Sequence, residues 1–503
     1  MIKIIHLNIA LILVSFAGGA VGADPQQKID APQKKQQSVE AVRPNFIQIL
    51  TDDQGWGDLA SFGHPFIQTP NIDRLAQEGG KFTACYSSAA VCSPSRSSIL
   101  TGRTPYRNGV YRFVPQNHFC HLPASEITLP QLLRGAGYQT AHFGKWHLSH
   151  YYEERIGKSE EFENFKFGDS PDQPDMAAYG YDYWLATGNV ARPCHKNPLN
   201  FFLNGKALGE VKGYSAQIVA AEFLRWMTEY RKAGEPFFVT VWFHEPHGPI
   251  ETDPAFMRPY AKLDDPSLRQ YYGNISQIDA AVGAIMQALE EAGVSDDTLV
   301  WYTSDNGPDG PHEFGSFNQT DSVYGRSRYR GSTGGLRGRK KSSHEGGIRV
   351  PGIIRWPAGM KRAGVTPGFV CDTPIIGSDV FPTFLDVAHV PLPDVTLDGV
   401  SILPLLEGRL FNRPRPLYWR TMHYQFRIAL RDNDWKIVGN SQRTEFELYN
   451  LRKDPRETTD LSLLEPERFE RMKAALIEYD KEVLAEGPTW WTRETEPGLI
   501  PLD

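Results

Sequence analysis

Residues 45–50 read Asn-Phe-Ile-Gln-Ile-Leu, a short apolar run that is followed at once by two carboxylates, Asp52 and Asp53. Such a run, without strict alternation, is typical of a strand buried on both faces, as in a parallel sheet. Amphipathic stretches of helical character separate runs of this kind along the chain. The sequence therefore predicts an α/β fold in which a large, mixed, mostly parallel sheet is flanked by helices.

Four further apolar runs each lead into polar, ionisable or reactive side chains. The runs are residues 82–86, 139–143, 236–243 and 298–303. The side chains that follow them are, in the same order, Cys92, then Lys145 and His147, then His247, and finally Asp305 and Asn306. Ligands of open α/β sheets bind outside the carboxyl ends of the strands. Five strand ends that deliver such residues to one edge predict an active site there.

The oxygen-bearing side chains at these strand ends suit a hard cation. Asp52, Asp53, Asp305 and Asn306 offer three carboxylates and an amide, the ligand set of Ca²⁺ or Mg²⁺ rather than of zinc or copper. Each pair alone also suits a turn or a helix cap after a strand. A single cation site is the simplest interpretation of all four together.

His147 and His247 are the candidates for proton transfer, because imidazole titrates near neutral pH. A lone histidine is more often a structural residue. Both of these, however, follow predicted strands and lie beside other polar groups in the sequence.

The segment around Cys92 carries the most specific pattern of the chain. Residues 92–96 read Cys-Ser-Pro-Ser-Arg, and residues 100–103 read Leu-Thr-Gly-Arg. Ser-Pro alone is a good helix start, and a lone cysteine is often a small buried hydrophobe. The whole spacing, however, resembles the signature of type I sulfatases, arylsulfatases and N-acetylgalactosamine-6-sulfatases among them, which share the alkaline phosphatase superfold. In these enzymes the cysteine is oxidised to Cα-formylglycine, whose hydrate attacks the sulfur of a sulfate ester.

The resemblance, which extends from about Asn45 to Leu484, implies a role for each residue at the strand ends. It implies calcium rather than magnesium, bound by Asp52, Asp53, Asp305, Asn306 and the oxygen of the modified Cys92. It implies that Arg96 holds the modified side chain, that His247 protonates the leaving alcohol, and that His147 helps to regenerate the aldehyde.

Two lysines match the sulfate-binding lysines of the family. Lys145 is one, and Lys340 is the other, within a basic run over residues 326–341 that otherwise suits a solvated loop. Arg339 and Lys341 stand beside Lys340 where the family often has small residues. Whether Lys340 or Lys341 reaches the sulfate is therefore open.

The substrate is expected to be a sulfated carbohydrate or an aryl sulfate. Residues 184–189 and 194–198 resemble the substrate-pocket loop of carbohydrate sulfatases, which makes Asn189 and His195 candidate substrate contacts. An ordinary loop is the alternative. Three tryptophans can either stack on a sugar ring or belong to the core, namely Trp146, Trp184 and Trp242.

Two other functions stay open at this point. One is a phosphodiesterase or phosphonate monoester hydrolase of the same superfold, and the other is a non-catalytic homologue that binds sulfated glycans. The net charge of −7 argues against general nucleic-acid binding. The resemblance also implies a partner that matures Cys92, either a formylglycine-generating enzyme or a radical enzyme.

The first residues predict export to the periplasm or the medium. Residues 1–23 have the basic start, short apolar stretch and small-residue cleavage site of a signal peptide. Residues 24–43 are rich in Gln and Lys and predict a flexible leader. No run reaches the ~20 apolar residues that a membrane helix needs.

A chain of 503 residues predicts two domains. We expect a catalytic domain over residues 44–412 and a smaller α+β domain over residues 413–503. The latter contains three alternating segments, typical of a half-exposed antiparallel sheet, and an apolar helical stripe over residues 467–484. Besides Cys92 there are four cysteines, whose pairing stays open, namely Cys85, Cys120, Cys194 and Cys371.

Overall fold

The computed structural model describes residues 43–114, 120–149, 173–310, 327–422, 427–488 and 490. The predicted signal peptide, residues 1–23, and the predicted leader up to residue 42 lie outside this part of the chain. Within the described part, the helices are all too short or too polar to cross a bilayer.

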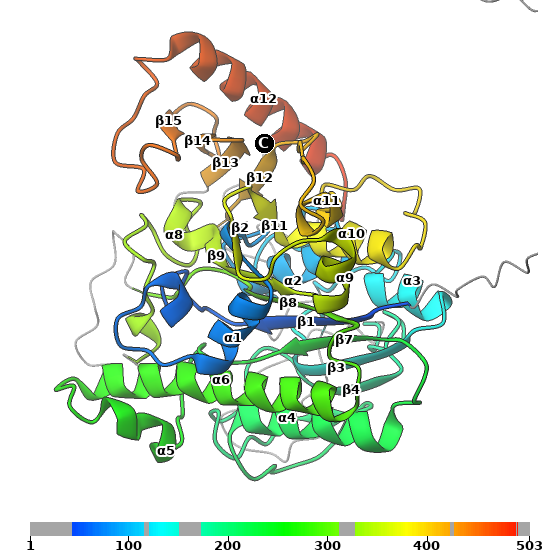
Figure 1. The fold of residues 1–503 in the computed structure, drawn as a ribbon. Helices are drawn as coiled ribbons and strands as arrows, with labels where there is room; N and C mark the ends of the chain where they lie inside the picture. Colours follow the sequence, from blue (N-terminus) through cyan, green and yellow to red (C-terminus); the bar gives the residue numbers. More distant parts are fainter. Residues whose placement is uncertain are drawn as a thin grey trace, which may run out of the picture. The chain divides into compact units, whose positions relative to one another are not determined.

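An eleven-stranded sheet, most of whose strand pairs are parallel, forms the centre of the fold (Figure 1). Its strand order is β10-β2-β9-β8-β1-β7-β3-β4-β5-β6, with β11 also paired to β2. Strand β9 is antiparallel to both β8 and β2, so β2 and β8 run in the same direction. The strands are β1 (Asn45–Thr51), β2 (Gly80–Tyr86), β3 (Gln139–Lys145), β4 (Tyr183–Thr187), β5 (Phe202–Leu203), β6 (Lys206–Ala207), β7 (Phe237–Trp242), β8 (Thr298–Ser304), β9 (Arg349–Arg355), β10 (Phe369–Cys371) and β11 (Ile375–Ile376). The predicted mixed, mostly parallel sheet is confirmed.

Strand β1 illustrates why this sheet is buried on both faces. Successive side chains of a strand point to opposite faces. Ile47 and Ile49 therefore pack with α1, α4 and α6, whereas Phe46 and Leu50 pack with α2, α3 and α10.

The longer helices are α1 (Pro70–Glu78), α2 (Cys92–Thr101), α3 (Leu129–Gly135), α4 (Ser215–Arg225), α6 (Pro266–Glu291), α9 (Pro357–Ala363), α10 (Val380–Val387) and α12 (Pro466–Leu484). The short helical turns are η1 (Ala60–Phe62), η3 (Trp226–Tyr230), α5 (Pro254–Met257), η4 (Arg258–Tyr260), η5 (Arg328–Arg330), α8 (Glu345–Ile348), η6 (Gly377–Asp379) and α11 (Leu403–Leu406).

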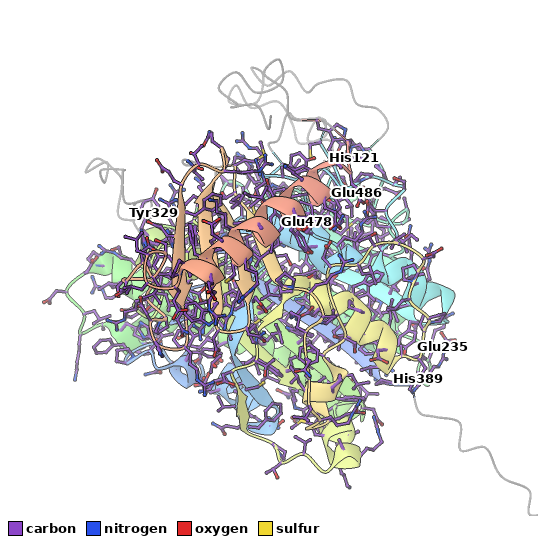
Figure 2. All side chains as sticks on the ribbon, turned by 90° about the horizontal axis from the view of Figure 1, so that it is seen from above. His121, Glu235, Tyr329, His389, Glu478 and Glu486 are labelled. Carbon is purple, nitrogen blue, oxygen red and sulfur yellow. The ribbon has the colours of Figure 1, made fainter. Side chains whose placement is uncertain are left out.

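A second, four-stranded antiparallel sheet follows, and α12 lies across it (Figure 2). Its strands are β12 (Leu417–Arg420), β13 (Arg427–Asp432), β14 (Trp435–Asn440) and β15 (Phe446–Asn450). One face, with Ile437, packs on Leu476 of α12. The other face, with Trp419 and Val438, packs on residues of β2 and on Ala90. The prediction of a half-exposed sheet is therefore wrong, because both faces are covered. The predicted domain boundary at residue 413 falls just before β12 and stays a prediction.

All five cysteines belong to the described part of the chain, and all five are free thiols there. Three are buried, namely Cys85, Cys92 and Cys120. The question of disulfide pairing is thus answered in favour of unpaired cysteines.

A buried ion cluster joins the second sheet to the segment that carries Lys340. Lys436 Nζ of β14 lies 2.9 Å from Glu345 Oε1 and 2.9 Å from Glu457 Oε1, and all three side chains are buried. His344 Nδ1 lies 3.3 Å from the same oxygen of Glu457. Burial alone would raise the pKa of Glu457, but Lys436 and His344 lower it to about 2.

This cluster predicts a measurable dependence of stability on pH. The pKa of Glu457 lies below its ordinary value of 4.5, so its charge stabilises the fold fully above that pH. The contribution is lost as the pH falls toward 2. We expect Glu457→Gln to destabilise the protein at neutral pH, with the difference from wild type shrinking by about 1.4 kcal/mol per pH unit in this window. Urea unfolding at a series of pH values measures this, and a difference that stays constant contradicts it.

Candidate active site

Five strands bring the predicted site residues to one edge of the main sheet. Strand β1 lies between β7 and β8, with β3 beside β7, and β2 is two strands from β8. Asp52 and Asp53 follow β1, where Asp53 turns the chain with a left-handed backbone (φ 65°) that few residues other than glycine adopt. Asp305 and Asn306 follow β8, and the backbone N–H of Asp305 donates to Thr51 O at 3.0 Å. The ligand candidates are therefore neighbours because their strands are neighbours.

Arg96 of α2 bridges two of the carboxylates through hydrogen bonds. Its guanidinium donates to Asp305 Oδ2 through Nε at 3.0 Å and Nη2 at 2.7 Å, and to Asp52 Oδ2 at 3.0 Å. Nη1 donates to Lys145 O at 2.9 Å, and the guanidinium carbon lies 5.2 Å from the ring centre of Trp242. The side chain is fully buried. The observed contacts of Arg96 are thus with the predicted cation ligands.

Two lysines neutralise the remaining charge. Lys145 Nζ lies 2.5 Å from Asp52 Oδ2. Lys340 Nζ lies 2.6 Å from Asp53 Oδ1 and 2.8 Å from Asp53 Oδ2. Lys341 contributes its backbone N–H to Ala90 O at 2.8 Å. Lys340 is therefore the lysine of this segment whose ammonium reaches the carboxylates.

The two carboxylates that share Arg96 differ in pKa. Burial pushes the pKa of Asp52 upward, but Lys145, His247 and Arg96 together lower it well below its ordinary range. Burial and the neighbouring Asp52 charge raise the pKa of Asp305 to about 6, against the effect of Arg96. Asp52 therefore holds its negative charge more firmly than Asp305, whose charge a bound cation would stabilise.

Two oxygens of this cluster accept no hydrogen bond from the described residues. Within the described residues, Asp52 Oδ1 and Asn306 Oδ1 are buried and accept no hydrogen bond, while Asn306 Nδ2 donates to Asp53 Oδ1 at 2.7 Å. Asp52, Asp53 and His247 each offer a ligand atom within 4.8 Å of the others. Buried polar atoms without a partner are costly. These residues therefore fit a hard divalent cation, whose preferred ligands are oxygens.

Cys92 is the first residue of α2 and is buried. Ile99 and Leu100 of the same helix pack into the core and fix its position. Burial raises the pKa of the Cys92 thiol, although Lys145 and Lys340 act in the opposite direction. The thiolate is the nucleophilic form of cysteine, so this environment does not suit thiolate chemistry.

The two predicted proton-transfer histidines are both in the cluster. His247 Nδ1 lies 2.6 Å from Gly248 O, and Nε2 lies 3.8 Å from Asp53 Oδ2. Its side chain is 19% exposed, whereas Asp52 and Arg96 are fully buried, so His247 is open to an incoming molecule. His147 Nε2 lies 2.9 Å from Val114 O, while Nδ1 is buried without a partner among the described residues. Burial and Lys145 hold the pKa of His147 well below its usual value, so the ring is neutral.

The two residues predicted to contact the substrate are buried or half-buried. His195 is fully buried, with Nδ1 3.8 Å from Glu245 Oε1, and burial lowers its pKa to about 3. It is therefore not on an open surface. Asn189 follows β4 and is half-buried, with its Oδ1 lacking a hydrogen bond within the described chain. The three tryptophans in question are core residues, namely Trp146, Trp184 and Trp242.

Arg328 is a residue at the site that sequence reasoning missed. A Cβ atom on Gly248 would lie 3.0 Å from Arg328 Cδ, which places this arginine beside His247. Its Nε lies 3.7 Å from Asp309 Oδ2, and its side chain is 39% exposed. The signal was the basic run over residues 326–341, which suggested only a solvated loop.

Comparison with known proteins agrees with this geometry. The family model described as Sulfatase matches residues 44–390. The chain belongs to the sulfatase family. A second model, N-sulphoglucosamine sulphohydrolase, C-terminal, matches residues 339–482 of this sulfatase.

Individual relatives give the same result. N-acetylgalactosamine-6-sulfatase of Homo sapiens is 34% identical over 391 residues, which cover 74% of this chain and 67% of that protein. Arylsulfatase A of Homo sapiens is 33% identical over 383 residues, covering 73% and 68%. The crystal structure of Ps i-CgsB in complex with k-i-k-neocarrahexaose has a TM-score of 0.74 at 24% identity and covers 90% of this chain and 96% of that one, a likeness of fold.

Family membership confirms the predicted family, fold class and enzyme class. This sulfatase is a sulfuric ester hydrolase. It belongs to a metal-dependent family, and its acidic cluster lies where the sequence predicted a cation site.

Proposed function

We propose that this sulfatase releases sulfate from a sulfated saccharide at the cluster around Cys92. In this proposal Asp52, Asp53, Asp305 and Asn306 hold calcium, and Cys92 is converted to formylglycine. The observation that carries the proposal is the set of buried oxygens without donors, Asp52 Oδ1 and Asn306 Oδ1, in a cluster that also holds two lysines. Calcium supplies positive charge at the sulfate oxygens, and hydrated formylglycine supplies a hydroxyl nucleophile.

The charges of the site favour an anionic ester. The carboxylates of Asp52, Asp53 and Asp305 balance the cations of Arg96, Lys145 and Lys340, three against three. A divalent ion therefore leaves a net charge of about +2, which stabilises the charge that develops on the sulfate oxygens. Lys145 and Lys340 bind these oxygens, and Arg96 keeps Asp52 and Asp305 in position.

Proton transfer is divided between the two histidines. His247 is the accessible one, and we assign it the role of acid at the leaving alcohol. Burial and Lys340 lower its pKa, so it depends on a bound anion to favour its protonated form. His147 keeps a neutral ring with Nδ1 without a partner in the described chain, which suits an acceptor of the proton that must leave when the aldehyde is restored.

We propose a saccharide as the substrate because the names of similar proteins refer to sugars and because the charges of the site suit a sulfate group. One relative is named for N-acetylgalactosamine-6-sulfate, and a similar solved structure holds a neocarrahexaose. An aryl sulfate is a suitable activated substitute for assays. We further propose export through the signal peptide of residues 1–23, and maturation of Cys92 by a formylglycine-generating or radical enzyme.

Sulfate release from sulfated oligosaccharides by the purified, matured enzyme tests the proposal. We expect kcat/KM for sulfate esters to exceed that for matched phosphodiesters and phosphonate monoesters by about 100-fold or more, because those phosphorus esters carry a second organic substituent in place of one of the three sulfate oxygens that the lysines and the cation are proposed to bind. Faster turnover of the phosphorus esters would favour a phosphodiesterase. Glycan binding without turnover, by protein whose formylglycine is verified by mass, would favour a non-catalytic role.

The acid role of His247 predicts a dependence on the leaving group. We expect His247→Ala to lower kcat/KM for a sugar sulfate by about 10²–10⁴-fold, since a sugar alkoxide needs protonation to leave. The loss on 4-nitrophenyl sulfate should be much smaller, because that leaving group is stable as an anion. His389→Ala, at an exposed histidine outside the site (Figure 2), should change neither rate. Equal losses on both substrates would contradict the acid role.

A further inference from the structure

A cleft of about 640 Å³ lies beside the active site. This volume is in the range of cavities that bind small molecules. One wall is formed by Lys196 and Tyr214, and the other by α5, η4 and the start of α6. Glu251 and Thr252 line it between these walls.

The cleft is a neighbour of the active site because the same segments line both. Lys196 follows His195, whose pKa is lowered by the charge of His247 as well as by burial. Glu251 comes four residues after His247, so their Cα atoms are at most about 14 Å apart. Tyr214 precedes Ser215, whose Oγ lies 2.8 Å from His244 Nδ1. In Figure 1, α5 lies at the end of the sheet toward which β1 points.

The charges in the cleft are mostly positive. Three cations line it, namely Lys196, Arg258 and Arg269, against the single carboxylate of Glu251. The lining therefore carries a net charge of +2. Within the described part of the chain, none of the three cations forms an ion pair within 4.0 Å, whereas the adjacent Arg330 pairs with Asp265 at 2.5 Å. A cleft in which cations outnumber carboxylates attracts an anion.

The remaining lining offers apolar surface for a ring. Tyr214 and Met257 face the cleft, and Lys196 Nζ lies 5.8 Å from the ring centre of Tyr214. The floor is held in place by Gln270, whose Nε2 donates to Ile250 O at 3.2 Å and whose backbone oxygen accepts from Thr252 Oγ1 at 3.0 Å. A preformed cleft with an aromatic wall and cationic rim suits a sugar ring that carries a charged group.

We propose that this cleft binds a second anionic sugar, sulfated or carboxylated, of a polymeric substrate while the first sugar lies at the active site. The proposal rests on the proposed function, since it makes the substrate an anionic oligosaccharide rather than a single sugar. The cleft contributes to substrate affinity and not to the hydrolysis step, because its lining cations lie outside the cluster of Cys92.

The double variant Arg258→Ala/Arg269→Ala tests the cleft. We expect KM for a sulfated hexasaccharide, such as a neocarrahexaose, to rise about tenfold, with kcat unchanged. Kinetics on 4-nitrophenyl sulfate should not change. The wild-type preference for the hexasaccharide should also weaken as salt rises from about 0.05 to 0.5 M. Lys262→Ala removes an exposed cation near the cleft that does not line it and is the matched control. An unchanged hexasaccharide KM in the double variant overturns the proposal.

Binding by inactive protein separates this proposal from the proposed function. In a Cys92→Ala background, the hexasaccharide should bind about tenfold more weakly when both arginines are replaced. If the matured wild-type enzyme releases no sulfate, the proposed function fails, and this binding difference still tests the cleft. Three hexasaccharides that differ only at the sugar proposed to lie in the cleft, which is sulfated, carboxylated or neutral, identify the anion that the cleft prefers. Equal affinity for the neutral one overturns the role of the cations.

Discussion

Cys92→Ala is expected to abolish sulfate release, with a loss of about 10⁴–10⁶-fold in kcat/KM, because it removes the nucleophile precursor. The fold should persist, since Ile99 and Leu100 and not Cys92 anchor α2 in the core. Thermal unfolding of the variant measures this, and its midpoint should stay close to that of the wild type. Cys120→Ala, at another buried thiol, is the control and should retain turnover.

The mass of the peptide that spans Cys92 gives an independent measurement. Formylglycine is lighter than cysteine, so active wild-type protein should yield a peptide below the mass encoded by residues 92–103. Activity should scale with the modified fraction across preparations. An unmodified thiol in fully active protein would contradict the mechanism, even if Cys92→Ala were inactive.

The strand ends could be predicted from sequence because each depends on local information. Residues 45–50 and 298–303 are apolar runs that end in acidic residues, and neighbouring parallel strands share an edge. Strand β9 was not identified. It contains Pro351 and Gly352, which are uncommon in strands, and a Cβ at Gly352 would lie 2.4 Å from Cys85 Cβ. The close approach of β2 to β9 therefore explains why a residue without a side chain stands at position 352.

Other features depended on contacts between distant residues. The alternation of residues 435–439 suggested an exposed face, yet Lys436 of β14 is buried and paired with Glu345 and Glu457. A sequence pattern gives the charge of a side chain but not its partners. The same limit applies to Arg96: the motif suggests a role at the modified side chain, which stays a prediction, but does not reveal the contacts with Asp52 and Asp305. The cleft at Lys196 likewise forms only when remote segments meet.

Arg96→Met is expected to lower the free energy of unfolding by about 3–5 kcal/mol. The substitution leaves two buried carboxylates, Asp52 and Asp305, without the guanidinium that now bridges them. Activity should fall as well, because both carboxylates are proposed cation ligands. Denaturant unfolding measures the first effect, and sulfate release measures the second.

One further variant shows whether the charge or the geometry of Arg96 stabilises the site, and a second variant serves as the control. Arg96→Lys keeps the charge, but one ammonium cannot replace the contacts of the guanidinium with Asp52, Asp305 and Lys145 O, so an intermediate loss is expected. Arg74→Met is the control, because Arg74 is 55% exposed and its pair with Glu290 should contribute only about 0–1 kcal/mol. If Arg96→Met were no less stable than Arg74→Met, Arg96 would have no role in positioning Asp52 and Asp305.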